Sequence, residues 1–312
     1  MINRVLFADT AHPLFTQKLN EVGFICDYFD DLNYEKAIEI GKNYTGIVIR
    51  SRFSIDSNLL NACTNLKWIA RVGAGMENID VKYAQTKGIS CLHAPEGNRN
   101  AVAEQAIGML LMLMNNLLKA DKEVRSGIWL REENRGFEIE GKTVGIFGFG
   151  NTGKSFAEKL SGFNCQILAY DKYKSHFGND LITECLPEDI FERADIVSLH
   201  LPLTAETKYF ANSTFFNSFK KPIWFINTSR GKVLQTDALI QALETKKVMG
   251  AALDVLEFES ISFEKMHEMP PAFQTLIKMP NVVLSPHIAG WTHESNIKMA
   301  QVLFNKIMAI KR

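Results

Sequence analysis

The stretch TVGIFGFGNTGKSFAEKL, residues 143–160, decides the fold of this chain. It opens with an apolar run, residues 143–147, that predicts a strand. The run leads into GFGNTG, in which Gly148, Gly150 and Gly153 have the spacing of a dinucleotide-binding turn. A lone GxGxxG pattern is weak evidence, because glycines also occur in ordinary turns, but here it joins a predicted strand to a helix-compatible run. The stretch therefore predicts the strand–turn–helix start of a parallel α/β sheet.

A carboxylate follows these glycines where a dinucleotide fingerprint requires one. The predicted strand at residues 166–170 ends on Asp171, roughly the twenty positions onward at which a ribose-binding carboxylate is expected. Glycines in the turn let the backbone approach a pyrophosphate, whose charge would lie at a helix N-terminus beside the amides of Asn151 and Thr152. The sequence therefore predicts a dinucleotide site.

The residues around Asp171 also indicate which dinucleotide is bound. The Asp171 carboxylate would accept hydrogen bonds from the adenosine ribose and would repel a 2′-phosphate, so we expect NAD rather than NADP. Lys172 and Lys174 weaken that preference, because cations beside the ribose could tolerate a phosphate. The sequence thus favours NAD without making the preference strict.

Elsewhere, short apolar runs alternate with segments of helical periodicity, a pattern typical of parallel sheets covered by helices. A chain of 312 residues exceeds the size at which one hydrophobic core usually keeps growing. We therefore predict an α/β protein with two doubly wound parallel-sheet domains. The expected strands of the first lie at residues 5–8, 25–29, 46–50, 68–72 and 89–93, with helices at 13–22, 34–40, 57–62 and 78–86. The expected strands of the second lie at residues 143–147, 166–170, 196–199, 224–227, 251–255 and 282–284.

A turn-rich stretch, residues 94–100, separates the two predicted sheets. Its proline, glycine and asparagines suit a connection between domains. A long helix is expected to follow at residues 101–126, closed by Gly127. Near the C-terminus, Thr292 with Ser295 predicts the start of a last helix.

Composition narrows the class of partner. The formal net charge is zero, so no basic field favours nucleic acid or an anionic membrane. The five cysteines are odd in number and far apart, which indicates reduced thiols rather than disulfides or a metal site. The most apolar run, residues 106–114, is too short to cross a bilayer, and no secretory signal is evident. We expect a cytoplasmic protein whose partner is a small molecule.

Three polar segments follow predicted strands of the second sheet, at the edge where α/β sheets bind ligands. They are NTSRG at residues 227–231, LDVLEFE at 253–259 and SPHIAG at 285–290. Arg230 suits the binding of a carboxylate, because its planar guanidinium pairs with two oxygens. His287 suits proton donation, and a carboxylate such as Glu259 would stabilise its imidazolium form. Taken singly, Arg230 could form a surface ion pair, Glu259 could be a solvated charge, and His287 could be a loop histidine. Their joint position beside the dinucleotide fingerprint favours catalysis.

With these motifs the sequence resembles the D-isomer-specific 2-hydroxy acid dehydrogenase family. The resemblance covers nearly the whole chain and includes RVGAGMENID at residues 71–80, NAVAEQAIGMLL at 100–111, GKTVGIFGFGNTG at 141–153 and DIVSLHLPLTAET at 195–207. It implies a Rossmann NAD-binding domain at residues 99–289. It also implies a discontinuous, flavodoxin-like substrate domain at residues 1–98 and 290–312, and a homodimer.

The resemblance also assigns roles to single residues. The catalytic arginine, glutamate and histidine fall on Arg230, Glu259 and His287. Backbone amides of Val72, Gly73 and Ala74 would hold the substrate carboxylate. The remaining cofactor contacts, beyond the three glycines, fall on Asn151, Thr152, Asp171, Thr228, Asp254 and Gly290.

One of these assignments departs from the family pattern. The family's glutamate is usually followed by proline, whereas Glu259 is followed by Ser260, and residues 260–278 are longer than usual. Glu257 stands two positions earlier. The choice of Glu259 over Glu257 therefore rests on its spacing from Asp254.

The substrate is the least defined feature. Within the family, residues 94–104 most resemble D-3-phosphoglycerate dehydrogenases. We expect the chain to lack the regulatory domain that many such enzymes carry. Arg50, Arg52 and Arg71 near predicted strand ends could bind a phosphate or equally be solvated charges. A glyoxylate or hydroxypyruvate reductase is the alternative. From another class, an NAD(H)-sensing binding protein without turnover stays open.

Overall fold

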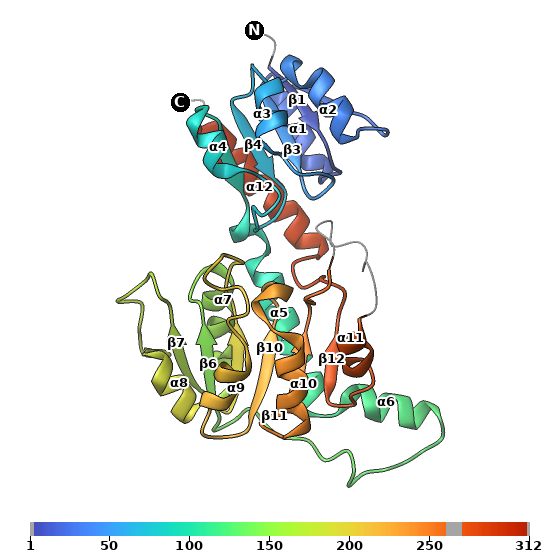
Figure 1. The fold of residues 1–312 in the computed structure, drawn as a ribbon, viewed down its shortest axis with the longest axis vertical. Coiled ribbons are helices and arrows are strands. Elements are labelled where there is room, and N and C mark those ends of the chain that lie inside the picture. Colours follow the sequence, from blue (N-terminus) through green and yellow to red (C-terminus); the bar gives the residue numbers. More distant parts are fainter. Residues whose placement is uncertain (1–2, 260–269, 311–312) are drawn as a thin grey trace. The chain divides into compact units, whose positions relative to one another are not determined.

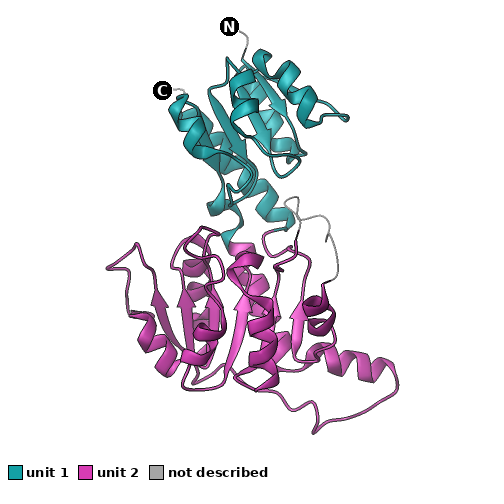
Figure 2. Ribbon diagram, in the orientation of Figure 1, with its two compact units in different colours: residues 1–99, 260–265, 291–312 teal, residues 100–259, 266–290 magenta. Residues whose placement is uncertain are grey.

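The computed structural model describes residues 3–259 and 270–310, and these form two compact units (Figure 2). Unit 1 contains the chain up to Arg99 and the segment from Trp291 onward. Unit 2 contains the chain from Asn100 to Glu259 and the segment ending at Gly290. Ser260, which stands where the family has proline, lies outside the described residues, as does the first part of the long segment after it.

Unit 1 is a five-stranded, all-parallel sheet with strand order β2-β1-β3-β4-β5 (Figure 1). This is the flavodoxin-like order, because the chain turns back across β1 before continuing outward. The strands are β1 (Arg4–Phe7), β2 (Ile25–Tyr28), β3 (Gly46–Ile49), β4 (Trp68–Arg71) and β5 (Ser90–His93). Central β3 and β4 are fully buried, as expected for strands covered on both faces.

Helices cover both faces of this sheet. On one face, buried side chains of α2 (Tyr34–Ile40), α3 (Ser57–Ala62) and α4 (Val81–Thr86) pack on the strands. On the other, Phe15 and Leu19 of α1 (Pro13–Glu21) pack with Met299 and Leu303 of α12 (His293–Ile310). The predicted start of α12 is present, since Thr292 Oγ1 accepts from the Ser295 amide at 3.0 Å. The C-terminal helix thus belongs to the core of unit 1.

Unit 2 is a seven-stranded, all-parallel sheet with order β12-β11-β10-β9-β6-β7-β8 (Figure 1). Its first six strands in sequence have the Rossmann order, with β12 added beside β11. The strands are β6 (Thr143–Phe147), β7 (Gln166–Tyr170), β8 (Ile182–Glu184), β9 (Ile196–Leu199), β10 (Ile223–Asn227), β11 (Val248–Leu253) and β12 (Val282–Leu284). The predicted fold class, two doubly wound parallel-sheet domains, is confirmed. Strand β8 was not predicted, because its three residues, ITE, include a single apolar one, whereas the equally short β12 is VVL.

The helices of unit 2 also form two layers. One hydrophobic cluster holds α8 (Pro187–Arg193), α9 (Ser213–Ser218), α10 (Thr236–Glu244) and α11 (Pro271–Leu276) on one face of the sheet. The other cluster holds α5 (Pro95–Met114) and α7 (Asn151–Lys159) on the opposite face. The remaining helix, α6 (Leu117–Arg125), has no buried residue.

The prediction of a turn at residues 94–100 followed by one long helix is wrong. Helix α5 begins at Pro95, since proline is well tolerated at the first helical position and Glu96 complements the helix dipole there. The change from unit 1 to unit 2 therefore falls inside a helix. The predicted long helix also breaks, because Asn116 adopts a left-handed φ of 52° and α6 starts in a new direction, 61° from α5.

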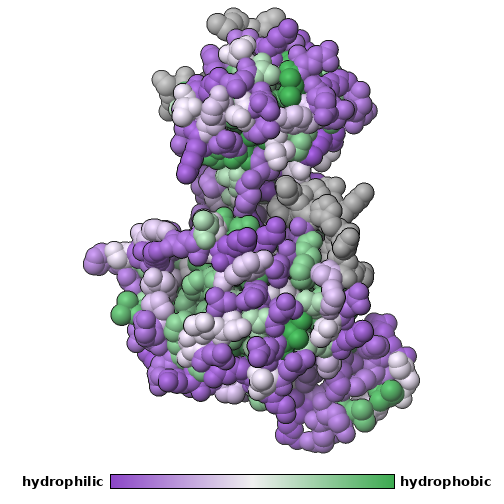
Figure 3. Space-filling model, viewed as in Figure 1, coloured by the Kyte–Doolittle hydropathy of each residue, from purple (hydrophilic) through white to green (hydrophobic). Residues whose placement is uncertain are grey.

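Helix α6 and the segment after it expose apolar side chains. Leu117, Leu118 and Val124 are about half exposed, and Trp129 is 76% exposed. Figure 3 shows hydrophobic residues at the surface in this region. Within the described residues no single helix has both the length and the apolar character to cross a bilayer, and only the bent pair α5 and α6 meets those criteria together.

Candidate active site

The carboxyl edge of the unit 2 sheet carries the predicted catalytic and cofactor-binding residues. The glycine turn follows β6, Asp171 follows β7, Arg230 follows β10, and His287 follows β12. The order in which strands are added across the sheet reverses between β6 and β9, which are hydrogen-bonded parallel neighbours. Such a switch point leaves a crevice at the carboxyl edge, and α/β proteins bind ligands there.

The turn after β6 has a geometry that requires glycine. Gly148 has a φ of 94°, and a Cβ atom on it would lie 2.5 Å from the backbone oxygen of His200. A Cβ atom on Gly153 would lie 2.1 Å from the carbonyl oxygen of Gly148. Helix α7 begins directly after Gly150, and no side chain caps its first amides. The turn therefore leaves a helix N-terminus without a capping side chain, as phosphate binding requires.

A further feature of this edge fits a dinucleotide. The Oγ1 atom of Thr228, after β10, is buried and has no hydrogen-bond partner within the described residues. A buried hydroxyl without a partner is costly, so it marks a position where a ligand would supply the missing bond. At Gly150, a Cβ atom would meet open space, so the turn is not filled by the protein itself. The residues present fit the predicted NAD.

Asp171 is tied to the glycine turn. Its Oδ2 atom accepts from the Phe149 amide at 2.7 Å, and its Oδ1 atom accepts from the Tyr173 amide at 3.0 Å. These bonds hold the carboxylate at the end of β7, beside the turn. Lys174, which was predicted to weaken the NAD preference, donates to the Phe149 carbonyl oxygen at 3.1 Å.

His200 is a residue that the sequence analysis did not single out. It directly follows β9, and burial lowers the pKa of its imidazole from 6.5 to about 3. Its Nε2 atom lies 2.9 Å from Ser198 Oγ, and its Nδ1 atom lies 3.2 Å from Thr152 Oγ1, on the first turn of α7. A neutral imidazole here fixes the helix start beneath the glycine turn. The sequence signal that could have indicated His200 was its place in DIVSLHLPLTAET, one of the stretches that carry the family resemblance.

His287 and Glu259 are in direct contact. The Nδ1 atom of His287 lies 2.6 Å from Oε2 of Glu259, and both side chains are mostly buried, with 22% and 15% exposed. His287 has a left-handed φ of 55°, which is uncommon for a residue with a Cβ atom. Backbone conformations of this kind persist where the surrounding structure holds them, often at functional sites.

Glu257, the rival carboxylate, is directed elsewhere. Its Oε2 atom accepts from the Thr236 amide at 3.0 Å, at the start of α10. It also hydrogen-bonds the Tyr209 hydroxyl, which raises the pKa of that tyrosine. The two glutamates therefore have separate tasks, and the carboxylate beside His287 belongs to Glu259.

Asp254 organises the segment that carries His287. Its carboxylate accepts from the Ser285 hydroxyl and from the amides of Ile288 and Ala289, at 2.5, 2.9 and 2.8 Å. Its backbone oxygen accepts from the His287 amide at 2.7 Å. Burial raises the pKa of Asp254, while these hydrogen bonds oppose that rise. The predicted cofactor contact is thus a residue that positions the histidine segment.

Arg230 lies on a constrained turn after β10. The Asn227 amide group donates to the Arg230 carbonyl oxygen at 3.1 Å, and the Arg230 guanidinium donates to the Ser229 carbonyl oxygen at 2.7 Å. Next to it, a Cβ atom on Gly231 would lie 1.8 Å from the Leu256 carbonyl oxygen. The turn after β10 therefore packs directly on the segment that leads to Glu259.

In unit 1, the predicted substrate-binding residues follow the neighbouring strands β3 and β4. The Val72 amide donates to the Ile49 carbonyl oxygen at 2.8 Å, so of the three predicted amides those of Gly73 and Ala74 are the better candidates. The Arg50 guanidinium lies over the Trp291 ring, 4.6 Å from its centre.

Of the two other arginines considered for a phosphate, Arg52 is engaged in contacts within unit 1. Arg52 pairs with Asp9 at 3.7 Å and donates to the Leu32 carbonyl oxygen at 3.3 Å. Arg71 is 8% exposed, beneath Gly73.

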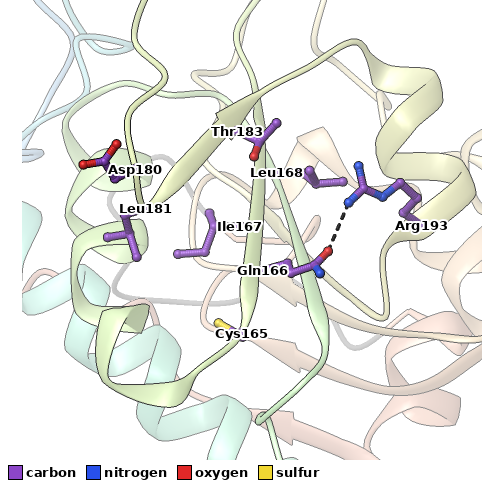
Figure 4. Close-up of a pocket in the computed structure, with 8 residues that line it drawn as sticks. All are labelled: Cys165, Gln166, Ile167, Leu168, Asp180, Leu181, Thr183 and Arg193. Atoms are coloured by element: carbon purple, nitrogen blue, oxygen red, sulfur yellow. Dashed lines mark hydrogen bonds between the residues drawn. The ribbon is translucent and has the colours of Figure 1, made fainter.

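A separate pocket of about 400 Å³ opens at the other edge of the unit 2 sheet, near the starts of β7 and β8 (Figure 4). On one side of it, the Arg193 guanidinium donates to Gln166 Oε1 at 3.0 Å. None of the predicted site residues lines it. The complete lining is Cys165, Gln166, Ile167, Leu168, Asp180, Leu181, Thr183 and Arg193.

Comparison with known families agrees with this arrangement. A family model described as "D-isomer specific 2-hydroxyacid dehydrogenase, NAD binding domain" matches residues 107–289, more than half of the chain. The chain belongs to this family. Membership of the D-isomer specific 2-hydroxyacid dehydrogenases confirms the predicted family and the predicted cofactor, NAD.

Relatives in the family carry different substrate names. The chain is 36% identical over 263 residues to a glyoxylate reductase of Thermofilum pendens, covering 82% of this chain and 75% of the relative. It is 31% identical over 307 residues to a D-3-phosphoglycerate dehydrogenase of Archaeoglobus fulgidus, covering 98% of this chain and 56% of the relative. The chain thus spans about half the length of the latter.

A solved structure supports the same family. The D-lactate dehydrogenase from Aquifex aeolicus, complexed with NAD and lactic acid, aligns with a TM-score of 0.83 at 26% identity. The alignment covers 99% of this chain and 95% of that one. That D-lactate dehydrogenase therefore shares the fold over nearly the whole of this chain.

Proposed function

We propose that this chain interconverts a 2-oxo acid and its D-2-hydroxy acid with NAD(H), using Arg230, Glu259 and His287. The observation that carries the proposal is the 2.6 Å contact between His287 Nδ1 and Glu259 Oε2 at the carboxyl edge of a dinucleotide-binding sheet. A histidine with a carboxylate on one ring nitrogen is suited to hold and transfer a proton from the other.

The residues divide the work of the reduction. Glu259 occupies Nδ1 of His287, so Nε2 is the atom that donates a proton to the oxo oxygen. Glu259 stabilises the imidazolium before this transfer and keeps the Nδ1 hydrogen bond after it. The Arg230 guanidinium pairs with the substrate carboxylate and polarises the oxo group. Bound NADH supplies the hydride that reaches the oxo carbon, and in the oxidation His287 takes the proton back.

For the cofactor, we propose that the glycine turn and the first amides of α7 bind the pyrophosphate. These amides belong to Asn151 and Thr152. Thr228 would supply its buried hydroxyl, Asp171 would accept from the adenosine ribose, and Gly290 would be a further cofactor contact. Asp254 would act through the segment that it organises.

For the substrate, we propose 3-phosphohydroxypyruvate and D-3-phosphoglycerate, with Arg50, Gly73 and Ala74 as the unit 1 residues that bind it. The resemblance of residues 94–104 and the Archaeoglobus fulgidus relative support this choice. Glyoxylate or hydroxypyruvate is the second candidate. It is favoured by the engagement of Arg52 in contacts within unit 1 and by the name of the Thermofilum pendens relative.

A single screen tests these proposals. The purified chain is mixed with NADH and, separately, 3-phosphohydroxypyruvate, hydroxypyruvate, glyoxylate or pyruvate, and the loss of NADH absorbance is followed. We expect the largest kcat/KM with 3-phosphohydroxypyruvate. A larger value with glyoxylate or hydroxypyruvate selects the second candidate. NADH binding without turnover on any of these acids contradicts the enzyme proposal and supports an NAD(H)-sensing protein.

We also propose that the chain forms a homodimer, supported by the exposed apolar residues of α6. Sedimentation equilibrium of the purified chain tests this, with twice the monomer mass expected. Leu118→Lys should shift the equilibrium towards the monomer, because it places a charge among the exposed apolar side chains.

A further inference from the structure

The loops after β7 and β9 are linked by a group of charged side chains. Lys172, directly after Asp171, forms an ion pair with Glu206. The Tyr173 hydroxyl also donates to Glu206. Because β6 lies between β9 and β7 in the sheet, these contacts join the two loops on either side of the glycine turn.

The loop that carries Glu206 is held in shape by its own threonines. The Thr204 amide donates to Thr207 Oγ1 at 2.8 Å, and the Thr207 amide donates to Thr204 Oγ1 at 3.2 Å. Thr207 Oγ1 also donates to the Pro202 carbonyl oxygen. Glu206 is therefore presented by a fixed turn, so its position opposite Lys172 is a property of the local structure.

Both lysines beside Asp171 are engaged. Lys172 pairs with Glu206, and Lys174 donates to the Phe149 carbonyl oxygen. From the sequence alone, both were candidates to accept a 2′-phosphate. If the adenosine ribose binds at Asp171, as proposed, a 2′-phosphate would approach the Asp171 carboxylate, while Glu206 already pairs with Lys172, the next residue along the chain.

The ion pair between Lys172 and Glu206 lies at the protein surface. The side chains of Lys172 and Glu206 are 56% and 44% exposed, and exposed pairs contribute little to stability. The pair is therefore expected to be dispensable for folding, yet it directs the lysine and adds a negative charge near the ribose. Removing the Glu206 charge would release Lys172 and would remove one negative charge that repels a 2′-phosphate.

We propose that Glu206 is a cofactor-specificity residue that, by pairing with Lys172, withholds this cation from a 2′-phosphate and so disfavours NADP. This inference rests on the proposed placement of the adenosine ribose at Asp171. It assigns the NAD preference to two carboxylates from different loops, where the fingerprint uses one.

The test compares dissociation constants for NADH and NADPH, measured by cofactor fluorescence on the full chain without substrate. Glu206→Gln is expected to lower the NADPH dissociation constant about fivefold, the scale of an exposed charge pair. The NADH constant should stay within about twofold. In a Lys172→Met background the same change should give no NADPH gain. Glu192→Gln, on the exposed surface of α8, removes an equal charge elsewhere and should alter neither constant.

The outcomes separate this inference from the proposed function. An unchanged NADPH constant in Glu206→Gln, or a gain that persists with Lys172→Met, overturns the role of Glu206, while NADH binding by the wild type leaves the dehydrogenase proposal intact. A wild type that binds no NADH overturns both. Glu206→Ala serves as a second variant, and its NADH constant reports whether the loop still folds.

Discussion

The Nδ1 atom of His287 lies 2.6 Å from the Oε2 atom of Glu259, and this contact joins the segment after β12 to the segment after β11. The backbone of His287 is also held by the segment after β11, because the His287 amide donates to the Asp254 carbonyl oxygen. Ring and backbone are thus fixed independently. Pre-organisation of this kind lets a proton donor act without reorganising during the reaction.

Replacing His287 by alanine should lower turnover by about two to four orders of magnitude, the usual contribution of a general acid. NADH binding should stay nearly intact, because the proposed pyrophosphate site lies at the glycine turn after β6. Steady-state kinetics and NADH fluorescence give the two readings. An unchanged kcat would remove His287 from the mechanism.

Glu259→Gln should reduce kcat for the 2-oxo acid by about 10- to 100-fold, since a hydrogen bond to a charged group is worth roughly 1.5–3 kcal/mol. Glutamine keeps the size of the side chain and loses the charge that stabilises the imidazolium. The matched control is Glu257→Gln. It should leave kcat almost unchanged and lower the free energy of unfolding by about 1 kcal/mol, because it weakens the bond to the Thr236 amide at the start of α10. If the kinetic losses are reversed between the two variants, the wrong carboxylate has been chosen.

Asp171→Ala should weaken NADH binding more than NADPH binding, with the ratio of the two dissociation constants changing by about tenfold. The variant also loses the bonds to the Phe149 and Tyr173 amides, a loss that would affect both cofactors alike. The ratio therefore isolates the ribose contact. Equal weakening of both cofactors would mean that Asp171 supports the turn without touching the ribose.

The buried His200 predicts a loss of stability in acid. Its pKa is lowered from 6.5 to about 3 in the folded chain, so below pH 6.5 the unfolded state binds a proton that the folded state does not. The stabilisation is complete above 6.5 and declines as the pH falls towards 3. At about pH 4.5 the loss should reach ~3 kcal/mol. Urea unfolding at pH 7 and pH 4.5 measures it, and His200→Gln should show a smaller difference. Equal differences in the two proteins would contradict a neutral buried His200.

Gly231→Ala should lower the free energy of unfolding by about 1–3 kcal/mol, because the added methyl group meets the Leu256 carbonyl oxygen at 1.8 Å. The movement needed would separate the Arg230 turn from the segment that leads to Glu259, so KM should rise as well. Gly162→Ala is the control, since a Cβ atom there has nothing within 4 Å. A Gly231 variant as stable as the Gly162 variant would refute the close packing.

Much of the fold could be predicted because parallel strands buried on both faces appear as short apolar runs. Strands β6 and β7 have the predicted bounds. Helix boundaries were less predictable where local signals compete. Pro95 was taken as part of a turn, but it is the first residue of α5, and Asn116 breaks the predicted long helix through a left-handed backbone. Both choices depend on packing that the sequence pattern does not contain.

The sequence by itself determined the dinucleotide turn, the carboxylate at Asp171 and the family, because these depend on local spacing between a strand and a helix. Only the tertiary structure decided which partner each charged side chain has. Glu257 and Glu259 are two positions apart, yet one caps α10 and the other contacts His287. Lys172, a candidate for a phosphate in the sequence, is paired with Glu206 from another strand's loop. Such pairings join segments distant in the chain, and only the folded sheet brings their ends to one edge.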